Sequence, residues 1–276
     1  MISTIKNQAK QISWLNQWVY STLYHWQTDC YVISYPKSGR TWLRTMMGYA
    51  LADHFNLQMT EYEPALIVKK YGKPAPYIRF RHAGSGLTLN EFKKNNFQVQ
   101  AYKNKKTIYL VRDPRDVLAS FYFHRTHRLD ESHDVNEFIE HDDWGIGRQL
   151  DFVTSWLAQR QVPKSFLLVR YEDLLSNAFA ELQRIFSFLP FAPIEQSSLH
   201  KAVDYASFDS MKQRAMSTKN GRLRPTNLAD PNSHKVRQGK VGGHKQLFST
   251  SQIEFINKMI QEQLPPELGY PIKDPS

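Results

Sequence analysis

Residues 35–42, YPKSGRTW, have the residue types of an anion-binding loop and directly follow the apolar run CYVIS. Gly39 lets the backbone approach a ligand closely, and a helix is predicted to begin at Arg40 or Thr41. The first N–H groups of that helix and the positive end of its dipole would face an anion. Positive charge and hydroxyl donors come from Lys37, Arg40, Ser38 and Thr41. The loop departs from the pattern G-x-x-x-x-G-K-[ST] because its lysine precedes its glycine, so a magnesium nucleoside triphosphate is not the expected ligand.

A second anion site is predicted in the segment YLVRDPRDVLASFYFHR. Arg112 ends a predicted strand there, and Asp113 is expected to cap the helix that follows. Ser120 lies almost two turns into this helix, so it can face the same crevice as Arg112 and bind an anion with it. Asp113, Arg115 and Asp116 are expected to be capping and surface charges. Two anion sites at neighbouring strand ends indicate a ligand with phosphates in two separate places.

The elements that position these residues follow from the apolar pattern. Strands are predicted at 29–35, 76–80, 106–111 and 165–170, and helices at 41–54, 114–126, 144–161, 177–189 and 251–263. Ser251 and Glu254 are predicted to form a capping box for the last helix. Nearly continuous apolar strands that alternate with helices indicate a single doubly wound α/β domain over residues 1–276. We expect a central parallel sheet of about four to five strands flanked by helices, with the ligand beyond the strands' C-terminal ends.

The charge of the chain allows several kinds of partner. Its 276 residues carry a formal net charge of +10, which suits a polyanionic ligand, nucleic acid or an anionic membrane surface. Residues 217–245 hold seven Lys or Arg against one Asp and are rich in Gly, Pro and Asn. They are predicted to form a long basic loop, which is either a lid over the ligand or a solvated loop.

The N-terminal segment 1–28 is predicted to be a helix that packs its aromatic side chains on the core. Its alternative is an interfacial membrane helix, but the segment carries little positive charge. It has no apolar stretch that could cross a bilayer and no signal-peptide pattern. The single cysteine, Cys30, cannot form an internal disulfide. A reducing, cytoplasmic location is therefore expected.

Five blocks of the sequence resemble the sulfotransferases that use 3′-phosphoadenosine 5′-phosphosulfate (PAPS), in the same order and at similar spacing. YPKSGRTW is similar to the family's 5′-phosphosulfate loop YPKSGTTW, and VRDPRDVLASFYFH to its 3′-phosphate segment. The others are RYEDL at 170–174, SFDSMK at 207–212 and RQGKVGGHK at 237–245. The resemblance covers most of the chain and implies a P-loop-like phosphosulfate loop in an α/β domain.

The resemblance also implies a role for each matching residue. Lys37 would approach the bridging oxygen and stabilise the leaving phosphate. The 5′-phosphate would be held by Ser38, Gly39, Arg40 and Thr41, and adenine by Trp42, Tyr171 and Phe208. The 3′-phosphate would be held by Arg112, Ser120, Arg237 and the backbone of Gln238 and Gly239. Displacement in line at sulfur needs positioning and charge stabilisation, and the sequence shows no metal-ligand spacing, so no metal is expected.

The acceptor hydroxyl must lose its proton, which calls for a neutral imidazole near the strand ends. His82 follows the predicted strand 76–80 at the place of the family's base, in RFRH where the family has K-T-H, and is predicted to be the general base. His124 and His127 are predicted to be structural. Three departures from the family are Arg40 for Thr, Gln238 for Lys, and GGHK for G-D-W-K.

Three functions remain open at this stage: a sulfotransferase, a phosphoryl-transfer kinase and a nucleic-acid-binding protein. The sulfotransferase is favoured, because the kinase lacks the required glycine spacing and because the proposed donor site accounts for part of the charge. The acceptor would be a small-molecule, carbohydrate or lipid hydroxyl, with no nucleic acid and no membrane span. KQLFSTSQIE at 245–254 is similar to the family's K-x-x-x-T-V-x-x-x-E dimer motif, so a homodimer and a monomer are equally expected.

Overall fold

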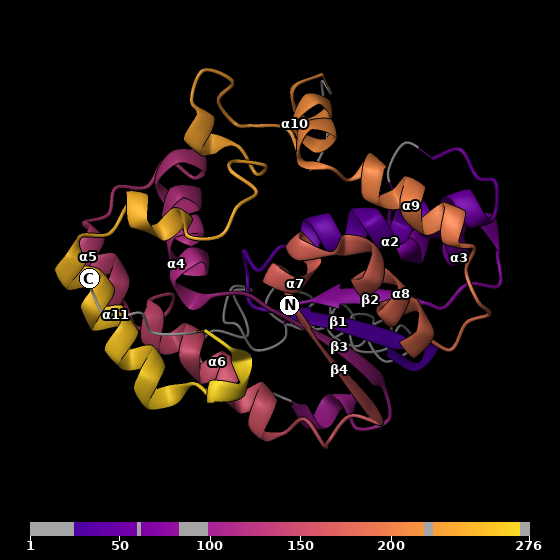
Figure 1. The fold of residues 1–276 in the computed structure, drawn as a ribbon, viewed down its shortest axis with the longest axis horizontal. Helices are drawn as coiled ribbons and strands as arrows, with labels where there is room; N and C mark the ends of the chain where they lie inside the picture. Colours follow the sequence, from indigo (N-terminus) through magenta and orange to yellow (C-terminus); the bar gives the residue numbers. More distant parts are fainter. Residues whose placement is uncertain (1–24, 60–61, 83–98, 218–222, 271–276) are drawn as a thin grey trace, which may run out of the picture.

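The computed structural model describes residues 25–59, 62–82, 99–217 and 223–270. Within these ranges one parallel sheet has the strand order β2-β1-β3-β4 (Figure 1). The strands are β1 (Cys30–Ser34), β2 (Ile78–Arg81), β3 (Lys106–Val111) and β4 (Ser165–Arg170). All four predicted strands and the α/β class are confirmed, with strand ends within two residues of the prediction. The four strands match the lower end of the predicted number.

The two central strands, β1 and β3, bury side chains on both faces of the sheet. In β1, Tyr31 and Ile33 enter one apolar cluster, whereas Cys30 and Val32 enter the other. The central strand β3 divides its side chains in the same way. Because successive side chains of a strand point to opposite faces, a strand covered on both sides is apolar at every position. The continuous apolar runs in the sequence have this cause.

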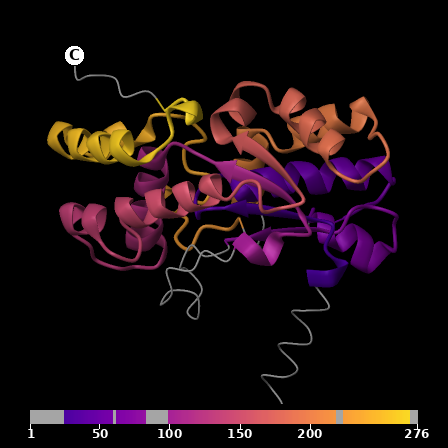
Figure 2. The ribbon, with the colours of Figure 1, turned by 90° about the horizontal axis from the view of Figure 1, so that it is seen from below.

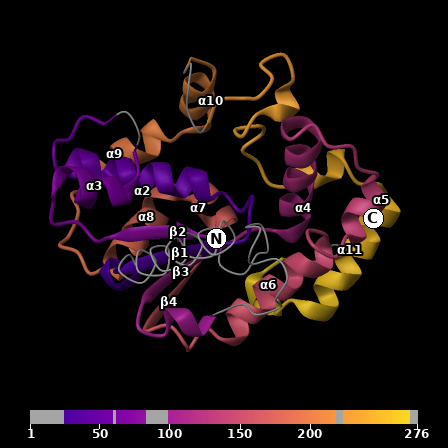
Figure 3. The same ribbon diagram turned by 180° about the vertical axis from the view of Figure 1, so that it is seen from behind.

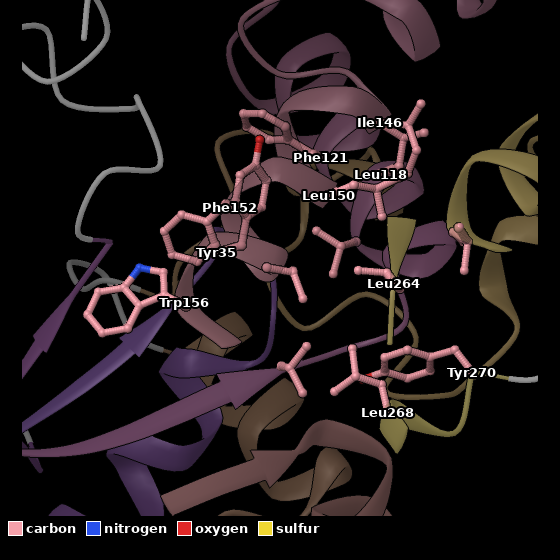
Figure 4. Close-up of a cluster of buried hydrophobic side chains, with 14 of the residues drawn as sticks. Tyr35, Leu118, Phe121, Ile146, Leu150, Phe152, Trp156, Leu264, Leu268 and Tyr270 are labelled. Atoms are coloured by element: carbon pink, nitrogen blue, oxygen red, sulfur yellow. The ribbon is translucent and has the colours of Figure 1, made fainter. Parts of the chain in front are cut away.

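Two groups of helices cover the two faces (Figures 1 and 3). One group is α4 (Pro114–Phe123), α5 (Val135–Glu140), α6 (Ile146–Ala158) and α11 (Thr250–Gln263). Its core includes Phe152 and Trp156 of α6, which lie near Tyr35 at the end of β1 (Figure 4). The other group is α2 (Arg40–His54), α3 (Pro64–Tyr71), α8 (Ala178–Phe188) and α9 (Gln196–Tyr205). In Figures 1 and 2, α9 lies along α2.

Two details of the predicted helices are wrong. The helix predicted over 114–126 is α-helical only to Phe123 and continues as the π-helix η2 (His124–Arg128). The capping box of α11 is formed by Ser249 and Gln252, not by Ser251 and Glu254. The Ser249 hydroxyl accepts a hydrogen bond from the Gln252 N–H at 3.3 Å, and the Gln252 side chain accepts one from the Ser249 N–H at 2.9 Å. The helix therefore begins at Thr250, one residue earlier than predicted.

The basic segment 217–245 lacks long helices and strands where it is described. Ser217 ends helix α10 (Phe208–Ser217), residues 218–222 lie outside the described residues, and the rest contains only the short 3-10 turns Pro231–Ser233 and Gly243–Gln246. The segment runs beside α4 (Figures 1 and 3), and its role as a lid stays a prediction. Of the predicted N-terminal helix, residues 1–24 lie outside the described ranges and residues 25–27 are helical. No described helix combines the length and apolar character needed to cross a membrane.

Candidate functional site

The C-terminal ends of all four strands contribute to one site. Strand β1 lies between β2 and β3, so the chain leaves β1 in one direction for β2 and then returns to its other side for β3. Such a reversal opens a crevice at the strand ends, where ligands bind in open α/β sheets. Lys37 follows β1, His82 follows β2, Arg112 follows β3 and Tyr171 follows β4. The sheet order thus gathers residues that are up to 134 positions apart in the chain.

The loop after β1 has the backbone conformation of an anion-binding turn. Gly39 is the N-cap of α2 with φ 94°, and no side chain caps this helix end. Helix α2 begins at Arg40, as predicted, so its N-terminal end points its dipole at the crevice. A Cβ atom at position 39 would lie 2.5 Å from the Tyr171 ring. Glycine is therefore required here both by the left-handed conformation and by the close approach of Tyr171.

The Lys37 ammonium group lies among other cations. Burial, and then the charges of Lys235 and Arg128, lower the pKa of Lys37 to about 7. Lys37 itself has a left-handed φ of 72°, which is uncommon for a residue other than glycine. Among the described residues, no carboxylate forms an ion pair with Lys37. These features fit a lysine that meets an anionic ligand.

Arg112 connects the loop after β1 with the basic segment. It donates hydrogen bonds to the Lys37 carbonyl and to the Lys240 carbonyl, each at 3.3 Å. Its guanidinium group stacks on the Tyr171 ring, 4.2 Å from the ring centroid. Its Nε is buried and has no hydrogen-bond partner in the described part of the chain. Buried donors are normally satisfied, so this Nε–H is available to a bound anion.

Ser120 and Arg237 line the same pocket as Lys37. Arg237 lies over the Phe123 ring, 4.1 Å from its centroid. Burial and the charge of Arg112 lower the pKa of the Arg237 guanidinium. The structure thus brings together the predicted 3′-phosphate residues, although they come from two separate segments of the chain.

A buried contact between Asp116 and His244 was missed in the sequence. The Asp116 carboxylate accepts hydrogen bonds from the Gly242 N–H at 2.8 Å, the His244 N–H at 3.0 Å and His244 Nδ1 at 2.8 Å. These bonds attach the basic segment to α4 next to Arg237. GGHK, which stands where the family has G-D-W-K, therefore supplies the histidine that binds Asp116. The two partners are 128 positions apart, so no local spacing could have indicated the contact.

The predicted surface position of three charges is wrong. Asp113 caps α4 as predicted and accepts a hydrogen bond from the Arg115 N–H. However, Asp113, Arg115 and Asp116 are only 5%, 9% and 2% exposed. Burial acts to raise the pKa of Asp116, but the hydrogen bond from His244 and the charge of Arg112 outweigh it and hold that pKa below its ordinary value. These three charged side chains are buried and form hydrogen bonds beneath the end of β3.

The predicted adenine-binding residues lie around the same strand ends. The Trp42 ring meets the Tyr171 ring edge-on at 5.6 Å. Trp42 Nε1 donates a hydrogen bond of 2.8 Å to the carbonyl of Ala206, two residues before Phe208. Gly239 has φ 60°, and a Cβ atom there would overlap the Phe208 ring. The neighbouring Gln238 side chain donates to Gln246 at 2.6 Å.

His82 lies at the end of β2 in a defined tautomer. Its Nδ1 is 2.8 Å from the Ser34 carbonyl, which can only accept, so Nδ1 carries the proton and Nε2 is an acceptor. Burial and the charge of Arg40 lower the pKa of His82 to about 3, although the bond to Ser34 opposes this shift. The ring is therefore neutral at pH 7. A neutral imidazole with a bare Nε2 can accept a proton.

The two other histidines of this region differ from each other. His127 Nδ1 lies 2.8 Å from Asp230, which supports the predicted structural role. His124 was predicted to be structural as well, but it lines the pocket that contains Lys37. Burial and the charges of Lys37 and Arg128 lower the pKa of His124 to about 3, so this ring is also neutral. No group of three His, Cys, Asp or Glu side chains that could hold a metal occurs in the ranges that the structure describes.

The chain is similar to one protein family and to several known proteins. The sulfotransferase domain family matches residues 27–265. Human sulfotransferase 2A1 is 30% identical over 247 residues, which cover 86% of this chain and 84% of that protein. The 3-alpha-hydroxysteroid sulfotransferase of Cavia porcellus is 27% identical, and the match covers 89% of this chain and 85% of that protein. The crystal structure of mouse sulfotransferase SULT7A1 complexed with PAP has a TM-score of 0.60 at 21% identity, covering 88% of this chain and 86% of that one.

Proposed function

This chain belongs to the sulfotransferase domain family, and on that premise we propose that it transfers the sulfuryl group of PAPS to an acceptor hydroxyl by in-line displacement. The main support is the cluster of Lys37, Arg112 and Arg237 at the strand ends, which presents buried positive charge to a ligand. The named complex of the mouse sulfotransferase with PAP also supports PAPS as donor. Family membership favours this reaction over the kinase and nucleic-acid-binding alternatives.

The residues around the loop after β1 would hold the donor and stabilise charge. PAPS supplies the sulfuryl group, and the 5′-phosphate of the product PAP is the leaving group. Lys37 would neutralise the charge that develops on the leaving phosphate, and the uncapped end of α2 would contribute its N–H groups. The 5′-phosphate would be held by Ser38, Gly39, Arg40 and Thr41. The 3′-phosphate would be held by Arg112, Ser120 and Arg237 with the backbone of Gln238 and Gly239, and adenine by Trp42, Tyr171 and Phe208.

His82 would act as the general base. The Ser34 carbonyl fixes the ring with Nδ1 protonated, so Nε2 can take the proton of the acceptor hydroxyl. Burial, and then the charge of Arg40, lowers the pKa of His82 and keeps the imidazole neutral. Binding of the anionic donor would offset the charges of Arg40 and Lys37, which would raise the pKa of His82 and strengthen it as a base.

The donor is tested by the binding of its product. We expect 3′-phosphoadenosine 5′-phosphate (PAP) to bind at least about 100-fold more tightly than ATP with magnesium, because the chain offers two separate phosphate sites. Isothermal titration calorimetry on the full chain measures both constants. Equal affinities would reject PAPS as the donor, and magnesium-dependent phosphoryl transfer from ATP would favour the kinase alternative.

Arg40 occupies the place of a threonine in the family, which makes Arg40→Thr an informative change. We expect kcat to stay within about threefold, because Lys37 and the helix end remain, whereas PAPS affinity changes. The charge of Arg40 lowers the pKa of His82, so its loss should move the acid limb of the kcat/KM profile to higher pH. Initial rates between pH 4 and 8 measure this. An inactive variant would instead assign Arg40 a catalytic role.

Several properties remain predictions. The named hydroxysteroid relative supports a small-molecule hydroxyl as acceptor, with carbohydrate and other lipid hydroxyls as alternatives. The segment 245–254 exposes Lys245, Thr250 and Glu254, in keeping with the dimer motif it resembles, which supports a homodimer. A single domain over 1–276, a cytoplasmic location, a metal-free reaction and the absence of a nucleic-acid partner rest on the sequence alone.

A further inference from the structure

The pocket beside Lys37 is lined by basic residues that the proposed donor site does not use. Four of its ten lining residues are Lys or Arg and none is Asp or Glu. Lys37, Ser120 and Arg237 are already assigned to the donor. His124, Arg128 and Lys235 are not, and they line the same pocket.

These additional residues extend the pocket beyond the proposed 3′-phosphate site. Ser120, His124 and Arg128 follow one another at intervals of four residues along α4 and η2, so they share one side of this helix. The helix runs away from the sheet toward the basic segment (Figure 1). Arg128 donates hydrogen bonds to the carbonyls of Ser233 at 3.1 Å and Arg224 at 2.9 Å. The segment that carries Lys235 is thereby fixed against η2.

Positive charge in this pocket extends beyond the residues of the proposed donor site. PAPS carries about four negative charges at neutral pH. The proposed donor site contains the basic side chains of Lys37, Arg40, Arg112 and Arg237, together with the Asp116 carboxylate 3.8 Å from Arg112. Arg128 and Lys235 add two more basic side chains, and theirs are the largest charge effects that lower the pKa of Lys37. Like charges that are held together in a partly buried pocket favour the binding of a further anion.

The same pocket contains unsatisfied ring nitrogens. His124 Nδ1 and His234 Nε2 are both buried and have no hydrogen-bond partner among the described residues. Both residues line the pocket. The nearby Asp230 carboxylate is already bound to His127 at 2.8 Å and to the Asn232 N–H at 2.9 Å. Buried polar atoms without a partner indicate a place for ligand atoms.

We infer that the acceptor is an alcohol or phenol that carries an anionic group, and that Arg128, Lys235 and His124 bind this group beside Lys37. The inference rests on the proposed function and names the substrate class of the same site. A phosphate, sulfate or carboxylate would satisfy both the cations and the imidazoles. A neutral acceptor would leave the buried ring nitrogens of His124 and His234 without partners, and a site built for polar contacts discriminates against a ligand that lacks them. This chain would then differ from its relative named for hydroxysteroids.

The test compares two ligands that differ by one anionic group, 2-naphthol and 6-hydroxy-2-naphthalenesulfonate. With the protein saturated with PAP, we expect the sulfonate to bind at least about tenfold more tightly in calorimetry, a preference that one or two charge-assisted contacts can supply. Lys235→Gln should reduce this preference by at least about fivefold, whereas Lys235→Arg should retain it. The exposed Lys258→Gln, on α11 outside the pocket, is the charge-matched control.

The outcomes separate the inference from the function on which it rests. PAP affinity should change by less than about twofold in Lys235→Gln, and the acceptor preference should persist in KM values measured with PAPS. The inference is overturned if both naphthols bind alike, if neither binds, or if Lys235→Gln weakens PAP binding as much as sulfonate binding. Failure of PAP to bind the unaltered protein would reject the proposed function and the inference together.

Discussion

Replacement of His82 by alanine is expected to lower kcat/KM for the acceptor by about two to four orders of magnitude. The reason is the loss of Nε2, the acceptor atom that the bond from Nδ1 to the Ser34 carbonyl leaves unprotonated. PAP affinity should stay nearly unchanged, because the neutral ring contributes no charge to the phosphate sites. Steady-state rates and calorimetry measure the two effects separately.

His200→Ala is the matched control for this change. His200 is exposed on α9, where it stacks on Phe179 at 4.1 Å and does not face the crevice. Its loss should leave kcat/KM within about twofold, as expected for a surface substitution. Full turnover by His82→Ala would remove His82 as the base.

The pH dependence of kcat/KM is a second, independent test of His82 as the general base. Only the neutral ring can accept a proton, so activity is lost as the pH falls through the pKa of His82. Burial and Arg40 lower that pKa to about 3 in the protein without its donor, from an ordinary value of 6.5. The acid limb of kcat/KM should therefore lie below pH 6.5, even after a bound donor raises the pKa in part. An acid limb above pH 6.5 would contradict this assignment.

Lys37→Met is expected to lower kcat by about two to three orders of magnitude, the usual effect of removing one stabilising group from a transition state. Methionine keeps an unbranched side chain of similar length but cannot stabilise the leaving phosphate. The fold should survive, because Gly39 and the start of α2 are unaffected. Single-turnover rates with PAPS measure the chemical step.

Proton uptake on PAP binding distinguishes the loss of the Lys37 amine from a structural change in the Lys37→Met variant. The pKa of Lys37 is about 7 in the protein, so at pH 8 the amine is largely neutral. A bound anion raises this pKa, and PAP binding at pH 8 should therefore take up a proton. Calorimetry in buffers of different ionisation enthalpy counts the proton. It should be absent in Lys37→Met and present in Lys258→Met, and equal uptake in both variants would contradict the prediction.

The strands, most helices and the candidate site residues could be predicted from the sequence alone. Alternating runs of strand and helix character predicted the four strands, and the central strands β1 and β3 are almost entirely apolar because they are buried on both faces. The turn at Gly39 and the cap at Asp113 were also readable, since both depend on neighbours within a few residues. The order of the motifs indicated the family before any geometry was known.

The interactions between charges that are distant in the sequence became visible in the three-dimensional structure. It buries Asp116 against His244, where the sequence suggested a surface charge. It also places His124 in the pocket of Lys37, where the sequence suggested a structural histidine. Burial and electrostatic interaction depend on distances in space, and a parallel sheet joins segments that are far apart in the chain. For that reason the low pKa values of Lys37 and His82, and the further basic residues beside Lys37, could not be read from spacing along the sequence.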